Sequence, residues 1–480
     1  MKYKYVVLTN TTIGSFMSQL DSNIVLISLP TIIRELPGTT TFDALWVIMG
    51  YILVTATLLL TFGRLADIYG RVKLYNLGFA VFTIGSGLCS IAPNGISLVL
   101  FRLLQGVGGA LIFSNNAAIL TDAFPANERG RAIGFNLVIG VSGSVIGLVA
   151  GGILTASLGW RSIFWINLPV GIFATAWAYA RLKELVSLQP ERLDPIGNTL
   201  FAAGLSIFLL GMTLGALIGY TPIEMAVMVA GLVMLVGFVY SEVRVSSPMM
   251  DLKLFEIRAF SAGMFSNFLA SISRGAALLL LVFYFQGALL MDALTAGILL
   301  IPFSIAFVSV GPLSGYLSDR YGARSFSTGG LLISAVAFAW FAILPANVSY
   351  TTLVLPMILA GIGGGMFVAP NISSIMNATP VARRGIAAGM SATMITTGFL
   401  LSLGLAFVIM ASTMPLSTLQ AIFAGLPVAA NELNVDLFLD AMHRMFWLMA
   451  VLSVVAAIPS ALRGAKYIHK SSLGELSQVA

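Results

Sequence analysis

Gly-Arg-Leu-Ala-Asp-Ile-Tyr-Gly-Arg-Val-Lys, residues 63–73, is a short polar stretch between two long apolar runs. Much of it recurs at residues 315–324 as Gly-Tyr-Leu-Ser-Asp-Arg-Tyr-Gly-Ala-Arg, and the offset from Asp67 to Asp319 is 252 residues. A pattern that recurs over such a distance is typical of a structural unit that occurs twice in one chain.

A second polar loop supports this repeat. Residues 125–130 (Pro-Ala-Asn-Glu-Arg-Gly) recur as residues 380–385 (Pro-Val-Ala-Arg-Arg-Gly), and the offset from Arg129 to Arg384 is 255 residues. The two loops follow the second and the fourth apolar run of each unit. The sequence therefore predicts two six-helix halves in parallel orientation.

The composition is typical of a polytopic membrane protein. Of the 480 residues, 58% are hydrophobic and 9% are charged, against about a quarter charged in soluble domains. The excess of 25 Lys and Arg over 19 Asp and Glu then reports membrane topology rather than an acidic partner, so we expect no nucleic-acid binding. The single cysteine, Cys89, excludes a disulfide framework and a cysteine-ligated metal site.

The apolar runs predict fourteen transmembrane helices, because about 20 apolar residues span a bilayer. Most Lys and Arg residues fall in the loops on one side of them, which predicts that both termini are cytoplasmic. The expected spans are residues 5–29, 43–62, 74–92, 96–121, 132–158, 161–181, 196–217, 223–243, 259–286, 292–316, 326–345, 351–376, 386–411 and 439–462.

These spans predict an all-α integral membrane protein in four parts. Residues 1–187 form the N-terminal six-helix half, and residues 259–462 form the C-terminal one. Residues 188–258 form an inserted two-helix hairpin with its flanking cytoplasmic linkers, since they have no counterpart in the repeat. Residues 463–480 form a cytoplasmic tail. The first apolar run shows no cleavage pattern, so we expect it to remain in the mature protein.

The first predicted helix contains an acidic residue, Asp21, within an apolar segment. Nine residues separate it from Pro30, about 13.5 Å at helical rise, which is close to the middle of a slab about 30 Å thick. An acid at that depth indicates a functional site. Arg102 begins about 9 Å below the outer surface, and its long side chain can extend to the depth of Asp21. The pair is either a proton-coupling site or a static ion pair.

Several motifs together resemble the major facilitator superfamily, and within it the fourteen-helix drug:proton antiporters. GRLADIYGRVK at 63–73 resembles the loop between its helices 2 and 3, QLDSNIVLISLP at 19–30 its first-helix motif, and RLLQGVGGA at 102–110 its fourth-helix motif. The antiporter motif of helix 5 is only partly matched, because Leu148 stands where the family usually has proline. The resemblance implies a major-facilitator-type fold.

The resemblance also assigns a conformational gate to the repeated loops. Asp67 would bind the cytoplasmic start of helix 13 near Gly385, where the helix dipole favours an anion, and Arg71 would pair with Asp122. These contacts would hold the cytoplasmic side shut. The expected gate residues are Gly63, Asp67, Gly70, Arg71, Asp122, Asp319 and Arg324; a merely solvated charged loop is the alternative.

Small residues on helix 5 favour close helix approach. By resemblance the neighbour would be helix 10, from the other half. Ordinary helix packing and a specific antiport role are both open for these antiporter-motif glycines, Gly143, Gly147, Gly151 and Gly152.

Arg274 is a second intramembrane charge, fifteen residues into the ninth predicted helix. Asp292 is its nearest expected partner by depth. If Arg274 instead faces the cavity, it favours an anionic or zwitterionic substrate. The other substrate-binding candidates are polar or aromatic residues in helices, for which packing is an equal alternative: Gln19, Asn23, Asn115, Asn116, Asn267, Phe283, Gln286 and Asn371.

Together these observations favour a proton-coupled secondary transporter in the plasma membrane that exports amphiphilic small molecules by alternating access, and we expect it to be a monomer. The alternative is transport of a lipid or an anionic metabolite with Arg274 as substrate contact. We expect no enzyme activity, cofactor or metal, because the sequence contains no phosphate-binding loop, metal-ligand cluster or nucleophile–histidine pair.

Overall fold

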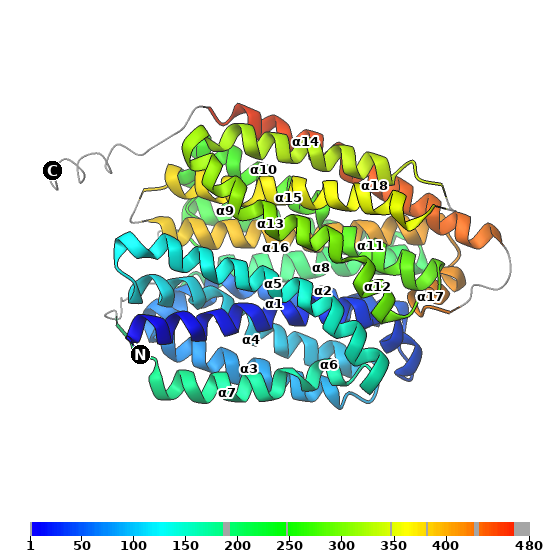
Figure 1. Ribbon diagram of the computed structural model, residues 1–480, viewed down its shortest axis with the longest axis horizontal. Coiled ribbons are helices and arrows are strands. Elements are labelled where there is room, and N and C mark those ends of the chain that lie inside the picture. Colours follow the sequence, from blue (N-terminus) through cyan, green and yellow to red (C-terminus); the bar gives the residue numbers. More distant parts are fainter. Residues whose placement is uncertain are drawn as a thin grey trace.

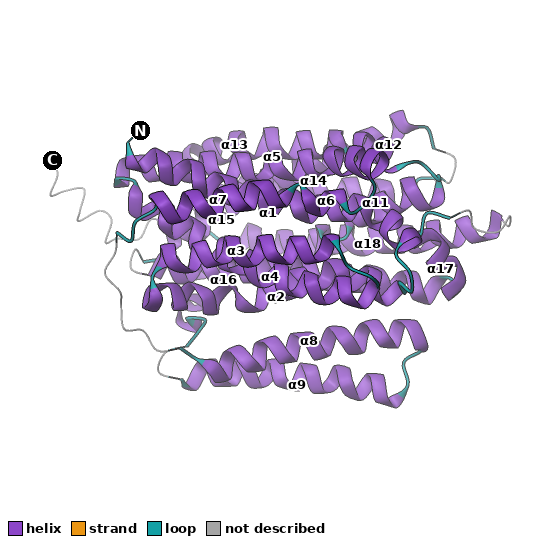
Figure 2. Cartoon of the chain, turned by 90° about the horizontal axis from the view of Figure 1, so that it is seen from below, coloured by secondary structure: helices purple, strands orange, loops and turns teal. Residues whose placement is uncertain are grey.

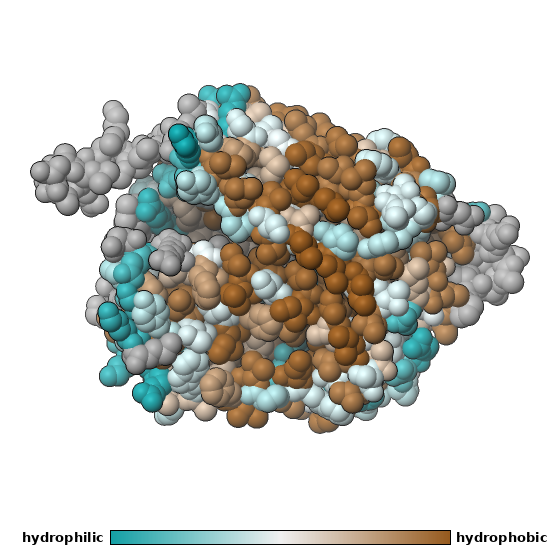
Figure 3. All heavy atoms as spheres, in the orientation of Figure 1, coloured by the Kyte–Doolittle hydropathy of each residue, from teal (hydrophilic) through white to brown (hydrophobic). Residues whose placement is uncertain are grey.

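The protein is described by a computed structural model, and the described residues are 2–185, 193–245, 248–345, 348–380, 383–426 and 432–464. Within them every regular element is a helix, as expected of a bilayer-spanning chain whose backbone must pair internally. Apolar side chains form a broad band across the middle of the molecule, and polar side chains gather at both ends of the helices (Figure 3).

The first group of helices, here called the N-terminal helices, comprises α1 (Tyr3–Glu35), α2 (Thr41–Tyr69), α3 (Arg71–Ser90), α4 (Gly95–Ala123), α5 (Ala126–Leu158), α6 (Ser162–Trp165) and α7 (Asn167–Arg181). A hairpin of α8 (Pro195–Ile218) and α9 (Pro222–Arg244) follows, and then a short 3₁₀ turn, Leu252–Glu256.

The second group, here called the C-terminal helices, comprises α10 (Arg258–Arg274), α11 (Ala277–Phe283), α12 (Ala293–Leu299), α13 (Ile301–Tyr321), α14 (Ala323–Phe341), α15 (Tyr350–Ala378), α16 (Arg384–Thr413), α17 (Leu416–Phe423) and α18 (Glu432–Leu462). A π-helical turn, Tyr284–Ala288, continues α11.

Thirteen helical segments in the described residues are long and apolar enough to cross a membrane. The ninth expected span is one of them, Arg258–Ala288, although the helix breaks after Arg274. The tenth expected span likewise combines α12 and α13. The eleventh expected span, residues 326–345, corresponds to α14, which is not among these segments. It lies beside α15 and α18 within the bundle.

The two groups of helices lie side by side with their long axes roughly parallel (Figure 1). The hairpin α8–α9 forms a separate layer along one face of the bundle (Figure 2). It packs on α2 from the N-terminal helices and on α16 from the C-terminal helices. Met212 of α8 and Gly404 of α16 are in direct contact, since a Cβ at Gly404 would overlap the methyl group of Met212. The hairpin therefore covers a seam between the two groups.

The repeated polar loops use glycine for a physical reason. Gly70 joins α2 to α3 at φ +108°, and Gly322 joins α13 to α14 at φ +89°. Side chains with a Cβ rarely adopt such angles, so both turns require glycine. Gly63, by contrast, lies inside α2 and forms no turn.

The start of α1 and the end of α18 lie at the same end of the molecule (Figure 1). Contacts at this end include a bond from the Tyr3 hydroxyl to the Lys183 carbonyl, 3.0 Å, and one from Arg258 Nε to the Leu462 carbonyl, 2.8 Å. We call the end of the molecule where α1 starts and α18 ends the basic end, after residues such as Lys183 and Arg258. Most of the expected tail, and the linker at 186–192, lie outside the described residues.

At the opposite end the two groups of helices meet closely. A Cβ at Gly152 of α5 would lie 2.6 Å from the carbonyl oxygen of Ala293, and one at Gly297 of α12 would lie 2.6 Å from that of Leu148. Gln286 Nε2 also donates across the interface to the Ile27 carbonyl at 2.8 Å. These backbone contacts close the molecule at the end away from the termini.

Candidate functional site

Asp21 on α1 is completely buried among the N-terminal helices, with 0% of its surface exposed. Its Oδ2 accepts from Arg102 Nη1 at 2.6 Å. Its Oδ1 accepts from Gln105 Nε2 at 2.9 Å and from Asn167 Nδ2 at 2.8 Å. Arg102 thus reaches Asp21 as its helical depth predicts, and α4 supplies two of the three donors from adjacent turns.

Arg102 is held as firmly as the acid it pairs with. Only 1% of it is exposed, and its Nε donates to the Val47 carbonyl of α2 at 3.1 Å. Its Nη1 also donates to Gln105 Oε1 at 2.7 Å, so Gln105 bridges the two charges. The guanidinium lies over the ring of Tyr51, 4.4 Å from its centroid, in a cation–π arrangement.

Two further residues complete the group, and the sequence reasoning missed both. Asn167, at the start of α7, donates to Ser86 Oγ of α3 at 3.1 Å as well as to Asp21. Ser86 in turn donates to the Phe164 carbonyl at 3.0 Å. The available signal was an amide inside an otherwise apolar run. We call Asp21, Arg102, Gln105, Asn167 and Ser86 the Asp21 cluster.

The hydrogen bonds of the Asp21 cluster suit an ionised carboxylate. All three groups that contact Asp21 donate, and a carboxylate only accepts. A proton on Asp21 would replace an acceptor by a donor and would leave the buried Arg102 without a counter-charge. The arrangement as it stands therefore pairs every oxygen of the carboxylate with a donor.

The opposite face of α1 packs on α5 through the glycines. A Cβ at Gly143 or Gly147 would lie 2.7 Å from the carbonyl oxygen of Phe16 or Leu20, and one at Gly151 would overlap Ile27. The expectation that these glycines meet helix 10 is therefore wrong for three of the four. Only Gly152 contacts that segment, at Ala293 and Leu294. The spacing indicated that one face of α5 consists of small residues, but it did not predict which helix packs against that face.

The gate residues form a charge cluster at the basic end. Arg71 Nη1 donates to both oxygens of Asp122, at 2.9 and 2.8 Å, which is the expected pairing. Its Nε donates to Asp67 Oδ1 at 2.8 Å. The expected partner of Asp67, the start of α16, is thus replaced by Arg71, and a Cβ at Gly385 would meet nothing within 4 Å. Arg324, in the repeated loop, is exposed, as is Asp319.

Four of the substrate candidates are asparagines that are bonded inside the bundle. Their partners are the carbonyls of Leu111 (2.8 Å, from Asn115), Thr11 (2.7 Å, from Asn116) and Gly263 (3.1 Å, from Asn371), and the Ser391 hydroxyl (3.0 Å, from Asn267). The bonds from Asn116, Asn371 and Asn267 join two helices, whereas the bond from Asn115 stays within α4. The structure therefore favours the packing alternative for Asn116, Asn371 and Asn267.

Four other substrate-binding candidates, Gln286, Phe283, Gln19 and Asn23, lie closer to the interface between the two groups of helices. Gln286 is 4% exposed and bonded to α1, and Phe283 packs edge-on against Phe423 with ring centroids 4.2 Å apart. Gln19 and Asn23 are only half-buried, on the α5 side of α1. These last two keep the most freedom to contact a substrate.

Among the residues that the structure describes, no acid pairs with Arg274. Asp292 does not pair with it: the Asp292 carboxylate caps α12 by accepting from the Thr295 amide at 3.0 Å and hydroxyl at 2.6 Å. The expected ion pair is therefore wrong, because helix capping provides a nearer partner at the entrance of α12.

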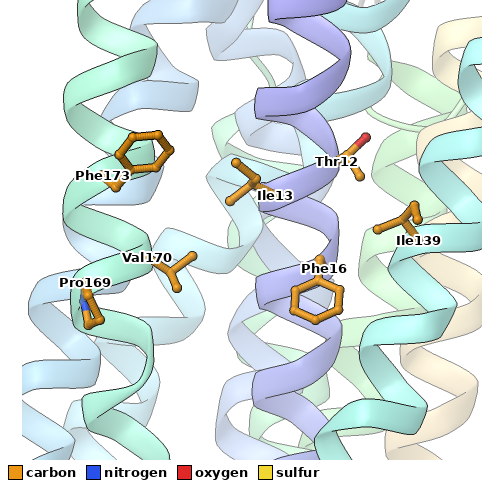
Figure 4. Close-up of a pocket in the computed structure, with 7 residues that line it drawn as sticks. All are labelled: Thr12, Ile13, Phe16, Ile139, Pro169, Val170 and Phe173. Carbon is orange, nitrogen blue, oxygen red and sulfur yellow. The ribbon is translucent and has the colours of Figure 1, made fainter.

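A groove of about 410 Å³ lies on another side of α1 (Figure 4). Its lining comes from α1, α5 and α7 and is apolar apart from one threonine: Thr12, Ile13, Phe16, Ile139, Pro169, Val170 and Phe173. It contains no charged side chain and does not reach the Asp21 cluster.

An all-helical bundle with thirteen candidate spans and a buried ion pair defines a polytopic membrane protein of the transporter type. The Major Facilitator Superfamily profile matches residues 11–249 and 263–473. The chain belongs to this superfamily of secondary transporters, and it is not an enzyme.

Two relatives show the range of named functions nearby. The chain is 34% identical over 409 residues to the "Riboflavin transporter RibZ" of Clostridioides difficile, covering 85% of this chain and 88% of the relative. It is 32% identical over 383 residues to the "Multidrug resistance protein Stp" of Mycobacterium tuberculosis, covering 79% and 71%.

Solved structures agree on the fold. An auto-inhibited peptide transporter of the POT family superposes with a TM-score of 0.67 at 18% identity, covering 98% of both chains. An inward-facing, unoccupied bacterial homologue of the human lysosomal transporter Spinster also superposes with a TM-score of 0.67 at 18% identity, covering 96% of this chain and 97% of the other.

Proposed function

We propose that this protein is a proton-coupled secondary transporter that exports amphiphilic small molecules by alternating access, with Asp21 as the proton site and Arg102 as its partner. The observation that carries the proposal is the Asp21–Arg102 pair, completely buried within membrane-spanning helices. Burying a charge pair at that depth is costly, and charged residues inside membrane helices are therefore usually functional.

Helix α1 connects the proton site to the interface between the two groups. On one face of α1, Asp21 contacts α4 and α7, and the opposite face packs against the glycines of α5. Further along, the Ile27 carbonyl of α1 binds Gln286 of the C-terminal helices. A shift of α1 on protonation of Asp21 would therefore alter contacts between the groups, which is the coupling that antiport requires.

The proposal includes an architecture of fourteen spans. In it, α14 is a span in addition to the thirteen found by length and hydropathy, and the chain divides into halves at 1–187 and 259–462 around the insertion at 188–258. The gate residues would alternate between two partners: Arg71 binds Asp67 here, and the start of α16 would bind Asp67 when the basic end closes. The close contacts at the opposite end support an inward-open state for this structure.

We infer the substrate class from the side chains that can contact a substrate and from the names of the relatives. No second acid was expected in the cavity, so recognition would depend on apolar surface and on half-buried groups such as Gln19 and Asn23. The names of the two relatives refer to riboflavin and to multiple drugs, which are organic molecules of this general kind. The alternative of an anionic metabolite or lipid at Arg274 is less well supported, because the space beside Arg274 holds about one water-sized species.

The test uses the purified full chain in liposomes, with ethidium and riboflavin as separate probes and a pH-sensitive dye inside. We expect an imposed pH gradient to drive probe movement in the wild type and in Asp440→Asn, whose acid lies in an exposed ion pair with Arg444. We expect Asp21→Asn to lose gradient-driven movement while still exchanging probe. Equal transport with and without a gradient, or full activity of Asp21→Asn, would show that coupling through Asp21 is wrong.

We also propose a plasma-membrane location, cytoplasmic termini and a monomeric state. The positive-inside pattern supports the orientation. Because the single cysteine, Cys89, is 0% exposed, background labelling by a membrane-impermeant maleimide should be low in intact cells. We expect Asn94→Cys to be labelled from outside and Lys253→Cys only after lysis. The reverse pattern would invert the topology.

A further inference from the structure

Arg274, at the end of α10, is a cation without a partner. In the described part of the chain no hydrogen bond or ion pair involves it, and its Nε is fully buried. The carbonyl end of α10 compensates about half an elementary charge. The side chain as a whole is half-buried, and the described residues supply no acid to balance the rest of its charge within a segment long and apolar enough to cross a membrane.

The position of Arg274 is next to the one that corresponds to Asp21. Asn116 of α4 donates to the Thr11 carbonyl of α1, and Asn371 of α15 donates to the Gly263 carbonyl of α10, so α1 and α10 are related by an offset of 252 residues. That offset pairs Asp21 with Ser273, and Arg274 follows directly. The surrounding helix contacts repeat as well: a Cβ at Gly108 of α4 would lie 2.3 Å from the amide nitrogen of Phe82 on α3, and one at Gly363 of α15 would lie 2.6 Å from that of Ser334 on α14. Arg274 therefore lies beside the place in the C-terminal helices that Asp21 has in the N-terminal ones, but it is only half-buried where Asp21 is fully buried.

The residues that surround Asp21 have no charged equivalents near Arg274. At the offset of 255 residues that relates Gly108 to Gly363, Arg102 corresponds to Met357 and Gln105 to Ala360. A serine stands at the place of Asp21, a base follows it, and none of these positions supplies an acid. The helix contacts thus repeat without a counter-charge for Arg274.

A small pocket lies beside Arg274. The pocket is lined by Ala270, Ser273, Arg274, Leu331, Ser334, Phe338, Gly364, Phe367 and Ser453, from α10, α14, α15 and α18. Its free space, about 10 Å³, accommodates roughly one water-sized species. None of these residues is acidic, and the aromatic and leucine walls make the surroundings apolar.

The hydroxyl groups in the pocket are not equivalent. Ser273 Oγ donates to the Met449 carbonyl at 2.7 Å, so Ser453 must donate in the 2.7 Å bond between the two serines. Both hydrogens are thereby used. Ser334 forms no hydrogen bond within the described residues, and its hydroxyl remains available to the pocket beside the guanidinium. The pocket thus offers N–H and O–H donors and a positive charge.

We propose that this pocket binds a small inorganic anion of the chloride class, held by the Arg274 guanidinium and the Ser334 hydroxyl. A monatomic anion matches the size of the space and supplies the counter-charge that no acid supplies. It would neutralise the C-terminal helices as Arg102 neutralises the carboxylate in the N-terminal ones. The proposal does not depend on proton coupling through Asp21.

The test is the thermal unfolding of the purified full chain, titrated with chloride at constant ionic strength against gluconate, which is too large for the pocket. We expect chloride to raise the Tm of the wild type by several degrees and to saturate, because a ligand that binds the folded state stabilises it. We expect Arg274→Gln to lose this response and Ser334→Ala to need several-fold more chloride. Arg444→Gln, which removes an exposed arginine, should respond as the wild type does.

A second measurement covers the case in which Arg274→Gln does not fold. Bromide scatters anomalously, so crystals of the wild type grown in bromide should show one peak beside Arg274 and none in Ser334→Val. A wild-type Tm that is identical in chloride and gluconate, a bromide peak elsewhere only, or an unchanged chloride response in Arg274→Gln would each overturn the proposal and leave the pocket to water.

Discussion

The Asp21 cluster and the pocket at Arg274 lie at similar depths in the two groups of helices, since Ser273 of the pocket corresponds to Asp21, yet they are built on opposite charges. Asp21 has three donors from α4 and α7 and is 0% exposed. Arg274 has an unbonded Nε and one free hydroxyl beside it. The glycine contacts that bring the helices together are kept in both groups, while the polar chemistry is not. The backbone arrangement can therefore repeat without its function.

The largest expected effect is a difference in stability between a variant that lacks Arg102 and one that lacks Arg274. Arg102→Met leaves Asp21 buried without a counter-charge and should cost about 3–5 kcal/mol, the usual penalty for breaking a buried pair. Arg274→Met leaves no acid behind and, measured in gluconate, should be neutral or stabilising. Thermal unfolding of the two variants in the same detergent measures the difference. Equal losses would mean that Arg274 has an acidic partner.

The next effect tests whether the helix contacts are equivalent. Gly108→Ala and Gly363→Ala each force a Cβ against the backbone of the neighbouring helix, at 2.3 Å and 2.6 Å. Overpacking of this kind costs about 1–3 kcal/mol, so we expect both variants to unfold at lower temperature. Gly134→Ala and Gly311→Ala are the controls, because a Cβ at either position meets nothing within 4 Å. If only one of the pair is affected, the two groups are not packed alike.

The smallest effect concerns Asp292, which the sequence offered as the partner of Arg274. Bonds from Thr295 lower the pKa of Asp292 below its usual value. Its stabilising contribution is thus present above the usual pKa of an aspartate and is lost as the pH falls through the lower value of the folded protein. Asp292→Ala should cost about 0.5–2 kcal/mol at neutral pH through loss of the cap.

Asp292→Asn separates the cap from the charge, because asparagine also caps helices. We expect this variant to keep its stability near neutral pH and to lose the acid-dependent part. Neither variant should change the chloride response of the protein. A changed response would place Asp292 within reach of Arg274 after all.

The sequence alone determined the class of the protein and its main elements. Long apolar runs can only be membrane-spanning helices, because the bilayer offers no other partner for the backbone. The repeated loops, with Gly70 and Gly322 at positive φ, predicted two similar groups of helices. The contact between Asp21 and Arg102 could be predicted from helical rise, because the rise along each helix gives the depth of its residues in the bilayer.

Only the tertiary structure decided what each face of a helix touches. Spacing showed that Gly143, Gly147 and Gly151 share a face, but not that α1, rather than helix 10, lies against it. Depth made Asp292 a candidate for Arg274, yet the hydroxyl and amide of Thr295 lie closer to it. Asn167 joins Asp21 from 146 residues away. Rise along a helix fixes depth, whereas rotation about the helix axis is set by neighbours that the local sequence does not contain.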